Sequence, residues 1–412
     1  MHVILEYLAI GVLIILFITI SLNMIEDVTG RLVTVKEEQL YNVAERLMDK
    51  ILLTPGFPAD WGTNIMVSSD DLRDFGLALN GTRAPYIIDP DKVMRLANLS
   101  ILPNPLLLNY NRIADLLGIS DDYGFRLEMK PMITHVVQPL EWYTPPGNRT
   151  SFPTKFKIRV LNWYKIGLPN ANVTGIYVIV KIKPGAGNNP NKIEEKKIFA
   201  ESNLTGALGE TIVDFTDVVP SYLENQPSTN WFLYFLLIHT QWHGFVAVHG
   251  YSATSETDAP TQGYIIGDAI ILSRELNGSS FNPNSGAIIV KDEIVQAVPQ
   301  YKELLNITSI IWCRSQPNDP EWCQEVASKV LPSSEDKYLI GKIQYVERLS
   351  SHVFVFAQWR GNPICVVINR IPEIDIGERS AQPANSVTIT RIAHIYNYPY
   401  IVRLTIWRKV EG

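Results

Sequence analysis

The chain of 412 residues is long enough for two or three domains with their own cores. Its hydrophobic content of 46% and aromatic content of 10% are globular values and exclude a chain that is disordered throughout. The net charge of −6 comes without a basic stripe, which argues against nucleic acid as a partner.

The N-terminal region, residues 1–54, predicts one long helix. Tyr7 to Ile25 is a run of 19 residues without a charge, and a helix of that length can cross the hydrocarbon core of a membrane, about 30 Å thick. Thr54-Pro55-Gly56 cannot continue a helix, so we expect the helix to end at Leu53. The first half of this helix therefore needs an apolar environment.

The second half of the helix has two different sides. Apolar residues recur at the three- and four-residue spacing of a single stripe, namely Leu40, Val43, Ala44, Leu47 and Ile51. Polar residues recur on another side, namely Glu38, Asn42, Glu45 and Asp49. We therefore expect the apolar stripe to pack on a folded domain and the polar side to face solvent.

Glu6 stands at the mouth of the apolar run, where an unpaired carboxylate in hydrocarbon costs a few kcal/mol. Two interpretations are open. Glu6 lies at the level of lipid headgroups, or it pairs with a partner such as the amino terminus of a neighbouring copy. A cleaved secretory signal is disfavoured, because Leu22 to Asp27 offers no small-residue cleavage site.

The N-terminal sequence His2-Val-Ile-Leu-Glu6 resembles the start of a mature type IV pilin, although no Lys/Arg-Gly leader precedes it in this sequence. Leu52 to Trp61 after the long helix, and then Gly124 to Glu128 as a strand, resemble archaeal pilin-like membrane-anchored proteins over roughly the first 130 residues. In pilins the glutamate pairs with the amino terminus of the adjoining subunit.

This resemblance implies a structural or minor subunit of an extracellular filament, with helices packed in its core and β domains exposed for adhesion or surface contact. The partners would be other copies or other pilin subunits, and the membrane during assembly. The implied assembly residues are Glu6, Tyr7, Leu8, Val12, Leu16, Leu40, Val43, Leu47 and Ile51. The alternative is a singly membrane-anchored ectodomain at the cell surface that binds a ligand or an S-layer partner.

The rest of the chain predicts a mainly β fold in two parts. Residues 55–144 and 263–412 are expected to form one β-rich head domain, and the alternative is that residues 263–412 form a separate third domain. The expected strands include short ones at Ile65 to Ser68 and Phe75 to Leu79 and a longer one at Tyr264 to Leu272. Residues 145–262 have short strands with regular turn signals and form a sandwich inserted in the head.

The inserted segment resembles an immunoglobulin-like or carboxypeptidase-regulatory-like module. The resemblance rests on a Gly-x-Pro-x-Ala-x-Val pattern at Gly167 to Val173 and a Thr-x-x-x-Gly pattern at Thr205 to Gly209. Modules of this kind act as spacers or display other parts of a protein, and they are seldom catalytic.

Three cysteines and seven sequons bear on the location of the protein. Cys313 and Cys323 bracket a short polar loop and are expected to form a disulfide, whereas Cys365 lies in an apolar strand and is expected to be a buried thiol. Used sequons would place everything after the helix at an extracellular surface. The sequon asparagines are Asn80, Asn98, Asn148, Asn172, Asn203, Asn277 and Asn306.

The sequence carries no nucleophile elbow, Walker loop, dinucleotide fingerprint or EF-hand loop, so we expect neither catalysis nor a cofactor. His239, His243 and His249 lie close together along the chain. A zinc site needs three converging ligands, and these residues read as ordinary strand histidines rather than as a metal site.

Overall fold

The computed structural model describes most of the chain. The described residues are 2–97, 106–146, 151–185, 190–226, 231–253, 261–278, 286–290, 305–313, 320–330, 338–344, 351–378 and 385–409, and within α1 the side chains are described at 16–24 and 37–53. The helices are α1 (His2–Leu53), α2 (Pro90–Met94), α3 (Tyr110–Leu117), α4 (Val218–Glu224) and α5 (Glu321–Val330). Strands dominate the described residues, so the predicted mainly β class is confirmed.

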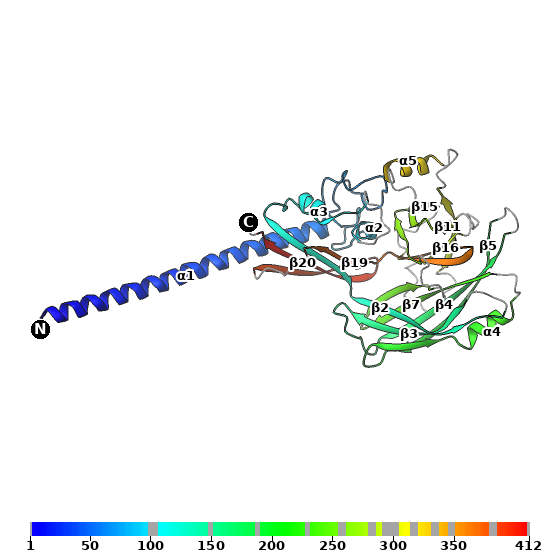
Figure 1. The fold of residues 1–412 in the computed structure, drawn as a ribbon, viewed down its shortest axis with the longest axis horizontal. Coiled ribbons are helices and arrows are strands. Elements are labelled where there is room, and N and C mark those ends of the chain that lie inside the picture. Colours follow the sequence, from blue (N-terminus) through cyan, green and yellow to red (C-terminus); the bar gives the residue numbers. More distant parts are fainter. Residues whose placement is uncertain are drawn as a thin grey trace.

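The first sheet joins distant parts of the chain beside α1 (Figure 1). Its antiparallel order is β18-β1-β20-β19, formed by β18 (Ile374–Gly377), β1 (Tyr123–Pro131), β20 (Tyr398–Arg408) and β19 (Ser386–Ile395). The second half of α1 packs on β19 and β20, because its apolar stripe and the inward residues of the sheet share one core.

The segment after α1 closes the end of the helix instead of forming strands. The predicted strand at Ile65 to Ser68 is wrong, since its first two residues form a turn and its last two have no regular secondary structure. The strand predicted over Phe75 to Leu79 is also absent from this described region, because Leu77 donates its backbone N–H to the Ile51 carbonyl and Ala78 donates to the Thr54 carbonyl. Carbonyls at a helix C-terminus lack partners within the helix, and this segment supplies them.

Two further sheets form a sandwich. One has the order β2-β3-β6 and the other β5-β4-β7-β8. Their strands are β2 (Ile133–Tyr143), β3 (Phe152–Asn162), β4 (Asn172–Lys183), β5 (Lys192–Leu204), β6 (Glu210–Asp214), β7 (Trp231–Trp242) and β8 (Phe245–Tyr251). Phe156, Tyr177 and Phe215 lie in the core between the sheets. The sandwich includes β2, which precedes the predicted boundary at residue 145.

The four-stranded sheet of this sandwich is covered on both faces. Tyr177 and Ile179 of β4 face the three-stranded sheet, whereas Val178 and Val180 belong to a second core shared with the C-terminal strands. Phe235 of β7 stacks on a phenylalanine from the C-terminal strands that form this second core, with 3.8 Å between the ring centroids. Burial on both faces explains the unbroken apolar run of β7, because a strand with one solvent-exposed face would alternate apolar and polar residues.

The remaining strands form two layers that continue the stack (Figure 1). One sheet has the order β14-β15-β10-β9, and the other the order β11-β16-β12-β13 with β17 also paired to β16. Their strands are β9 (Tyr264–Ile266), β10 (Ala269–Ser273), β11 (Leu276–Asn277), β12 (Ala287–Val290), β13 (Leu305–Thr308), β14 (Ile310–Trp312), β15 (Tyr338–Ile343), β16 (His352–Trp359) and β17 (Asn362–Asn369).

The single strand predicted over Tyr264 to Leu272 is wrong, since β9 and β10 form an antiparallel hairpin there. Gly267 turns the chain with a φ of +59°, and a Cβ at this position would overlap the Thr63 carbonyl group. Only glycine adopts this conformation without cost. The turn therefore depends on a contact with a segment about two hundred residues earlier, which local sequence does not reveal.

Truncating Ile51 tests the contribution of the helix stripe. Ile51 is fully buried between α1 and the first sheet, so Ile51→Ala is expected to lower the free energy of unfolding by about 2–5 kcal/mol. Chemical denaturation of the full chain measures this change. Asn42→Ala, on the exposed side of the same helix, is the control and should change stability by less than about 0.5 kcal/mol. Equal midpoints for the two variants would contradict the packing.

Candidate functional site

The most distinctive surface is the exposed part of α1. Figure 1 shows this helix running away from the body toward its N-terminus. Among the side chains described there, Phe17 is 73% exposed and Met24 is 65% exposed. Leu16, Ile18, Ile20 and Leu22 are exposed as well. Over the residues whose side chains are described, no helix offers an apolar stretch sufficient to span a membrane.

The predicted assembly residues divide into three groups. Leu16 is exposed. Four residues, Leu40, Val43, Leu47 and Ile51, pack in the core of this chain's own head, with Val43 only partly buried. The side chains of Glu6, Tyr7, Leu8 and Val12 lie outside the described residues. Within one copy, the stripe therefore holds the helix on the head, and the surface left for another molecule lies nearer the N-terminus.

Polar contacts fix the direction in which α1 leaves the head. Glu45 forms an ion pair with Arg391 of β19 at 3.2 Å, and Lys50 forms one with Asp74 at 2.8 Å. These pairs are partly exposed and contribute little stability individually. Together with the buried stripe they connect the helix to both the first sheet and the segment that follows α1.

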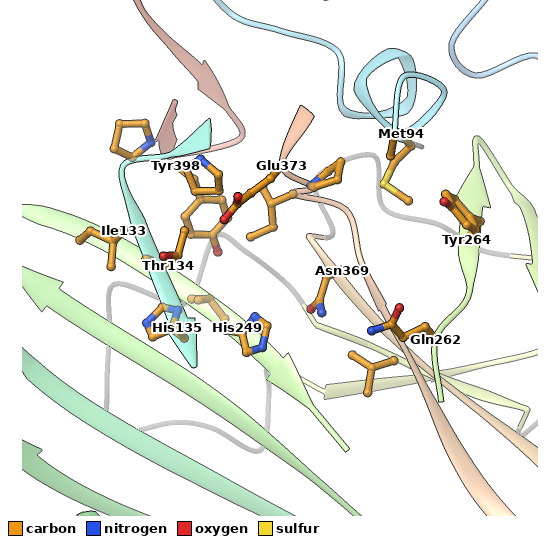
Figure 2. A pocket seen from close by; sticks show the side chains of 18 of the residues that line it. Met94, Ile133, Thr134, His135, His249, Gln262, Tyr264, Asn369, Glu373 and Tyr398 are labelled. Atoms are coloured by element: carbon orange, nitrogen blue, oxygen red, sulfur yellow. The ribbon is translucent and has the colours of Figure 1, made fainter. Parts of the chain in front are cut away.

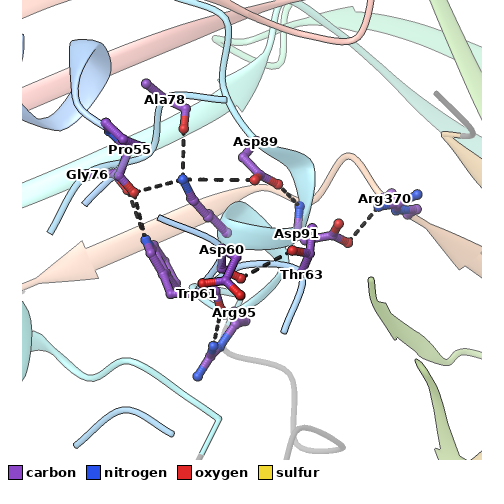
Figure 3. A network of polar contacts seen from close by, with 11 residues as sticks. Pro55, Asp60, Trp61, Thr63, Gly76, Ala78, Asp89, Asp91, Arg95 and Arg370 are labelled. Carbon is purple, nitrogen blue, oxygen red and sulfur yellow. Dashed lines mark hydrogen bonds and ion pairs between the residues drawn. The ribbon is translucent and has the colours of Figure 1, made fainter. Parts of the chain in front are cut away.

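A network of buried charged side chains lies beyond the end of α1 (Figure 3). Lys92 of α2 is fully buried, and its ammonium donates to the carbonyls of Pro55 and Ala78, each at 2.8 Å. Burial lowers the pKa of Lys92 to about 8, while Asp89 and Asp60 oppose the shift. The ammonium thus replaces strand hydrogen bonds in a segment that has few of them.

Arg95 extends the same network. Its guanidinium donates to the carbonyls of Trp61 and Val67 in the segment after α1 and to the carbonyl of Leu106 in a later stretch. Burial lowers the pKa of Arg95 to about 10, with Asp71 opposing. A planar group with five donors suits this convergence, since it can donate to several carbonyls at once.

Asp91 links the network to the C-terminal half of the chain (Figure 3). Its carboxylate accepts a hydrogen bond from Arg370 at 2.6 Å, and both side chains are buried. Burial alone would lower the pKa of the Arg370 guanidinium, but the Asp91 carboxylate raises it above its ordinary value. The pair joins α2 to the residue that follows β17.

Sequence reasoning did not identify these ionic residues as structural. Arg95 follows the apolar pair Val93-Met94 and precedes Leu96-Ala97, so an isolated cation in an apolar stretch was the available signal. Arg370 likewise follows the apolar strand β17.

A cavity of about 540 Å³ lies where the sandwich meets the first sheet (Figure 2). The rings of His135 on β2 and His249 on β8 stack in its wall with centroids 5.7 Å apart. Tyr398 and Glu373 line the cavity from the C-terminal part of the chain, and Met94 lines it from α2. The wall mixes these few polar groups with aliphatic side chains.

Further histidines surround this pair. His239 on β7 is buried, and His352 at the start of β16 is fully buried with its Nδ1 bonded to the Ser351 hydroxyl at 2.6 Å. Burial lowers the pKa of His249 to about 4. Burial, with a smaller effect of His249, lowers the pKa of His352 to about 3. Burial also lowers the pKa of His135 well below its ordinary value, with His249, His352 and His239 adding to the effect. The rings of His135, His249 and His352 thus stay neutral together near pH 7.

The predicted strand histidines occupy different places. His239 is buried in β7, His249 lines the cavity, and His243 is exposed in the turn between β7 and β8. Within the part of the chain that the structure describes, no three histidine, cysteine or acidic side chains are grouped as metal ligands. His135 and His352, which the sequence did not single out, complete the cluster through β2 and β16.

The cysteines and four of the sequon asparagines are described. Cys313 and Cys323 form a disulfide between the end of β14 and α5, and Cys365 is a buried free thiol. The described sequon side chains are all exposed, namely Asn80, Asn172, Asn203 and Asn277. Those outside the described residues are Asn98, Asn148 and the side chain of Asn306.

Neither a protein-family model nor a curated protein sequence matches this chain. Arguments about its function therefore depend on its own residues and geometry.

Replacing Asp91 tests the buried ion pair. Asp91→Asn removes the carboxylate that pairs directly with the buried Arg370 guanidinium, and breaking a buried ion pair costs about 3–5 kcal/mol. Chemical denaturation of the full chain measures the loss. Asp91→Leu combined with Arg370→Met removes both charges and should recover most of the stability. If the double variant were no more stable than Asp91→Asn, the pair would not be the source of the loss.

Acid should destabilise the histidine cluster. An unfolded histidine binds its proton near pH 6.5, whereas His352 in the fold stays neutral down to about pH 3. The stability that depends on the neutral ring is therefore complete above pH 6.5 and is lost as the pH falls from 6.5 toward 3. We expect His352→Gln to reduce the stability difference between pH 7 and pH 5 by about 2 kcal/mol.

Denaturation curves at pH 7 and pH 5 test this prediction. His243→Asn is the control, because His243 is exposed and its positive φ of 47° suits asparagine. The same pH dependence in His352→Gln as in the unmodified chain would show that this ring does not contribute to the acid response.

Proposed function

We propose that this chain is a subunit of an extracellular filament of the type IV pilin kind. In this proposal α1 is a continuous rod, and its N-terminal half packs against the same helix of neighbouring copies. The β layers face outward for adhesion or surface contact. The observation that carries the proposal is the exposed apolar surface of α1 at Leu16, Phe17 and Met24.

Exposure of this kind is costly for an isolated molecule. Large apolar patches on soluble proteins mark sites that another surface covers. Here the exposed apolar residues spread over most of the circumference of the helix, because Leu16, Phe17 and Ile18 are consecutive and cannot share one stripe. A helix with apolar residues on several sides is suited to contacts with several neighbours at once, as in the core of a helical filament.

The attachment of α1 to the head also favours a filament. The buried stripe, the Glu45–Arg391 pair and the closure of the helix end by Leu77 and Ala78 hold the head at one orientation on the rod. Regular stacking of rods then places successive heads at regular intervals. A flexible linker between helix and head would not impose such order.

The disulfide and the exposed sequons favour an extracellular location. Disulfides persist in oxidising compartments, and Cys313–Cys323 fits that environment. The exposed asparagines Asn80, Asn172, Asn203 and Asn277 are accessible positions for glycans. The sandwich, which resembles an immunoglobulin-like module in sequence, would present the outer surface.

Replacing one exposed apolar residue of α1 tests the filament proposal. Phe17→Asp introduces a charge into the proposed core, where a buried unpaired carboxylate is strongly unfavourable. We expect sedimentable filaments to disappear while the head keeps its unfolding midpoint. Pelleting and electron microscopy measure assembly, and near-ultraviolet circular dichroism reports on the head.

Phe17→Leu is the matched control and should retain assembly. Glu6→Ala tests the register role that the pilin resemblance implies, and it should impair assembly with the head still folded. Peptide mass spectrometry of filaments sheared from source cells provides the independent test. Finding the chain wholly in the membrane fraction, and finding assembly unaffected by Phe17→Asp, would both count against the proposal.

A further inference from the structure

The cavity between the sandwich and the first sheet contains an imidazole whose hydrogen-bonding atoms the fold does not use (Figure 2). His249 of β8 lines the cavity and is half-buried. None of the residues that the structure describes forms a hydrogen bond with either ring nitrogen of His249. Burial keeps this ring neutral at pH 7, because it lowers the pKa to about 4. A neutral imidazole has one donor and one acceptor, so both can serve a molecule inside the cavity.

Neighbouring groups hold the His249 ring in place. The ring of His135 stacks on it with 5.7 Å between the centroids, and the Nε2 atom of His135 is itself hydrogen-bonded to the Thr240 hydroxyl at 2.9 Å. The Asn369 side chain accepts from the Gly250 N–H at 3.2 Å and donates to the Gly250 carbonyl at 3.3 Å. These contacts fix the ring and the backbone of the next residue. A group fixed in this way loses little conformational entropy when a ligand binds.

A second polar group in the same wall also lacks a partner. Thr134 of β2 lines the cavity next to His135. Its hydroxyl oxygen is buried, and among the described residues it has no hydrogen-bond partner. A buried hydroxyl without a partner is unfavourable, and rotation about a single bond is enough to redirect it. This wall therefore gains from a ligand that brings hydrogen-bonding groups with it.

The charges at the margin of the cavity are already paired. Glu373 and Asp375 are exposed there. Glu373 forms an ion pair with Lys165 at 2.6 Å, and Asp375 forms one with Arg126 at 2.9 Å. The described residues that line the cavity include no lysine or arginine. An anionic ligand would thus meet no cation in the wall, and a cationic one would compete for carboxylates that already have partners, so a neutral ligand fits better.

Most of the remaining wall is apolar. Met94 and Tyr264 lie across the cavity from His135 (Figure 2). Aliphatic side chains complete the wall, namely Ile133, Val246, Val248, Val367 and Ile371. The volume of about 540 Å³ lies within the range of small-molecule sites, about 300–1,000 Å³. A purely apolar ligand would leave the nitrogens of His249 without partners, so the cavity suits a molecule that combines apolar faces with hydrogen-bonding groups.

We propose that this cavity binds a small neutral molecule with hydroxyl groups, of the monosaccharide class. A sugar hydroxyl both donates and accepts, as the neutral imidazole of His249 does. The hydroxyls at the edge of the sugar ring bond to His249, and its C–H face packs against Tyr264 and the aliphatic side chains. The site uses no residue of α1, so it is a binding function additional to filament assembly.

Saturation-transfer NMR of the full chain with matched sugars tests the proposal. The neutral probes are glucose, galactose, mannose and N-acetylglucosamine, and the charged probes are glucosamine and glucuronate. We expect at least one neutral sugar to bind, and both charged sugars to bind about tenfold more weakly or not at all, because a charge entering this cavity loses its hydration. Tighter binding of a charged sugar would overturn the preference for neutral ligands. Binding of none of the six would overturn the site.

His249→Phe tests the role of the imidazole. Phenylalanine keeps a flat ring against His135 and removes both ring nitrogens, so the affinity for the neutral sugar should fall about tenfold. His243→Asn is the matched control, because it removes an exposed imidazole from the neighbouring turn outside the cavity. This control should bind the sugar as the unmodified chain does. Unchanged affinity in a folded His249→Phe variant would contradict the role given to His249.

A cavity-filling variant decides the location of the site if His249→Phe does not fold. Val246→Phe adds a larger side chain to the same wall from a half-buried position of β8, and it should abolish sugar binding while circular dichroism stays unchanged. A folded Val246→Phe variant that still binds the sugar would place the site elsewhere and overturn the proposal. Sedimentation measured on the same samples reports assembly through α1, so failure of sugar binding and failure of the filament are distinguished.

Discussion

The packing of the second half of α1 on β19 and β20 joins the first and last parts of the chain. The first sheet is complete only when β1 has paired with β18 and β20. The strands that cover the apolar stripe of α1, β19 and β20, follow the stripe by more than three hundred residues, so the stripe has no sheet to pack on until they are in place. Contacts of such sequence separation fold slowly and cooperatively. The direction of α1, and hence any assembly that it drives, depends on completion of this sheet.

The buried charged side chains hold together a different region, the irregular segment between α1 and β1. Few backbone groups of that segment pair in strands, yet many are buried, and buried carbonyls need donors. Lys92 of α2 and Arg95, the residue that follows this short helix, supply them. Asp91 then ties the same helix to Arg370 across 279 positions of sequence. These ionic groups determine which segments contact each other. They add little net stability compared with apolar residues, because the desolvation of the charges offsets most of their attraction.

Sequence predicted the parts of the fold that depend on local pattern. The stripe from Leu40 to Ile51 indicated a covered helix face, and the polar loop between Cys313 and Cys323 indicated a disulfide. The sequence alone does not show which residues far apart along the chain contact each other. The break at Gly267 depends on Thr63, and the role of Arg370 depends on Asp91. The histidine cluster also escaped detection, because its members come from β2, β7, β8 and β16 and no spacing along the chain connects them.

The exposed part of α1 and the head differ in what they require of the proposed filament. Exposed apolar residues cover most of the circumference of α1, so this surface tolerates several arrangements of neighbouring helices and specifies register weakly. The head, by contrast, is held at one orientation on the helix by the buried stripe and the Glu45–Arg391 ion pair. The layers of the head are closely packed, because each shares a core with the next. In the proposed filament the rods would therefore supply cohesion, and the rigid heads would limit the angles at which neighbouring rods pack.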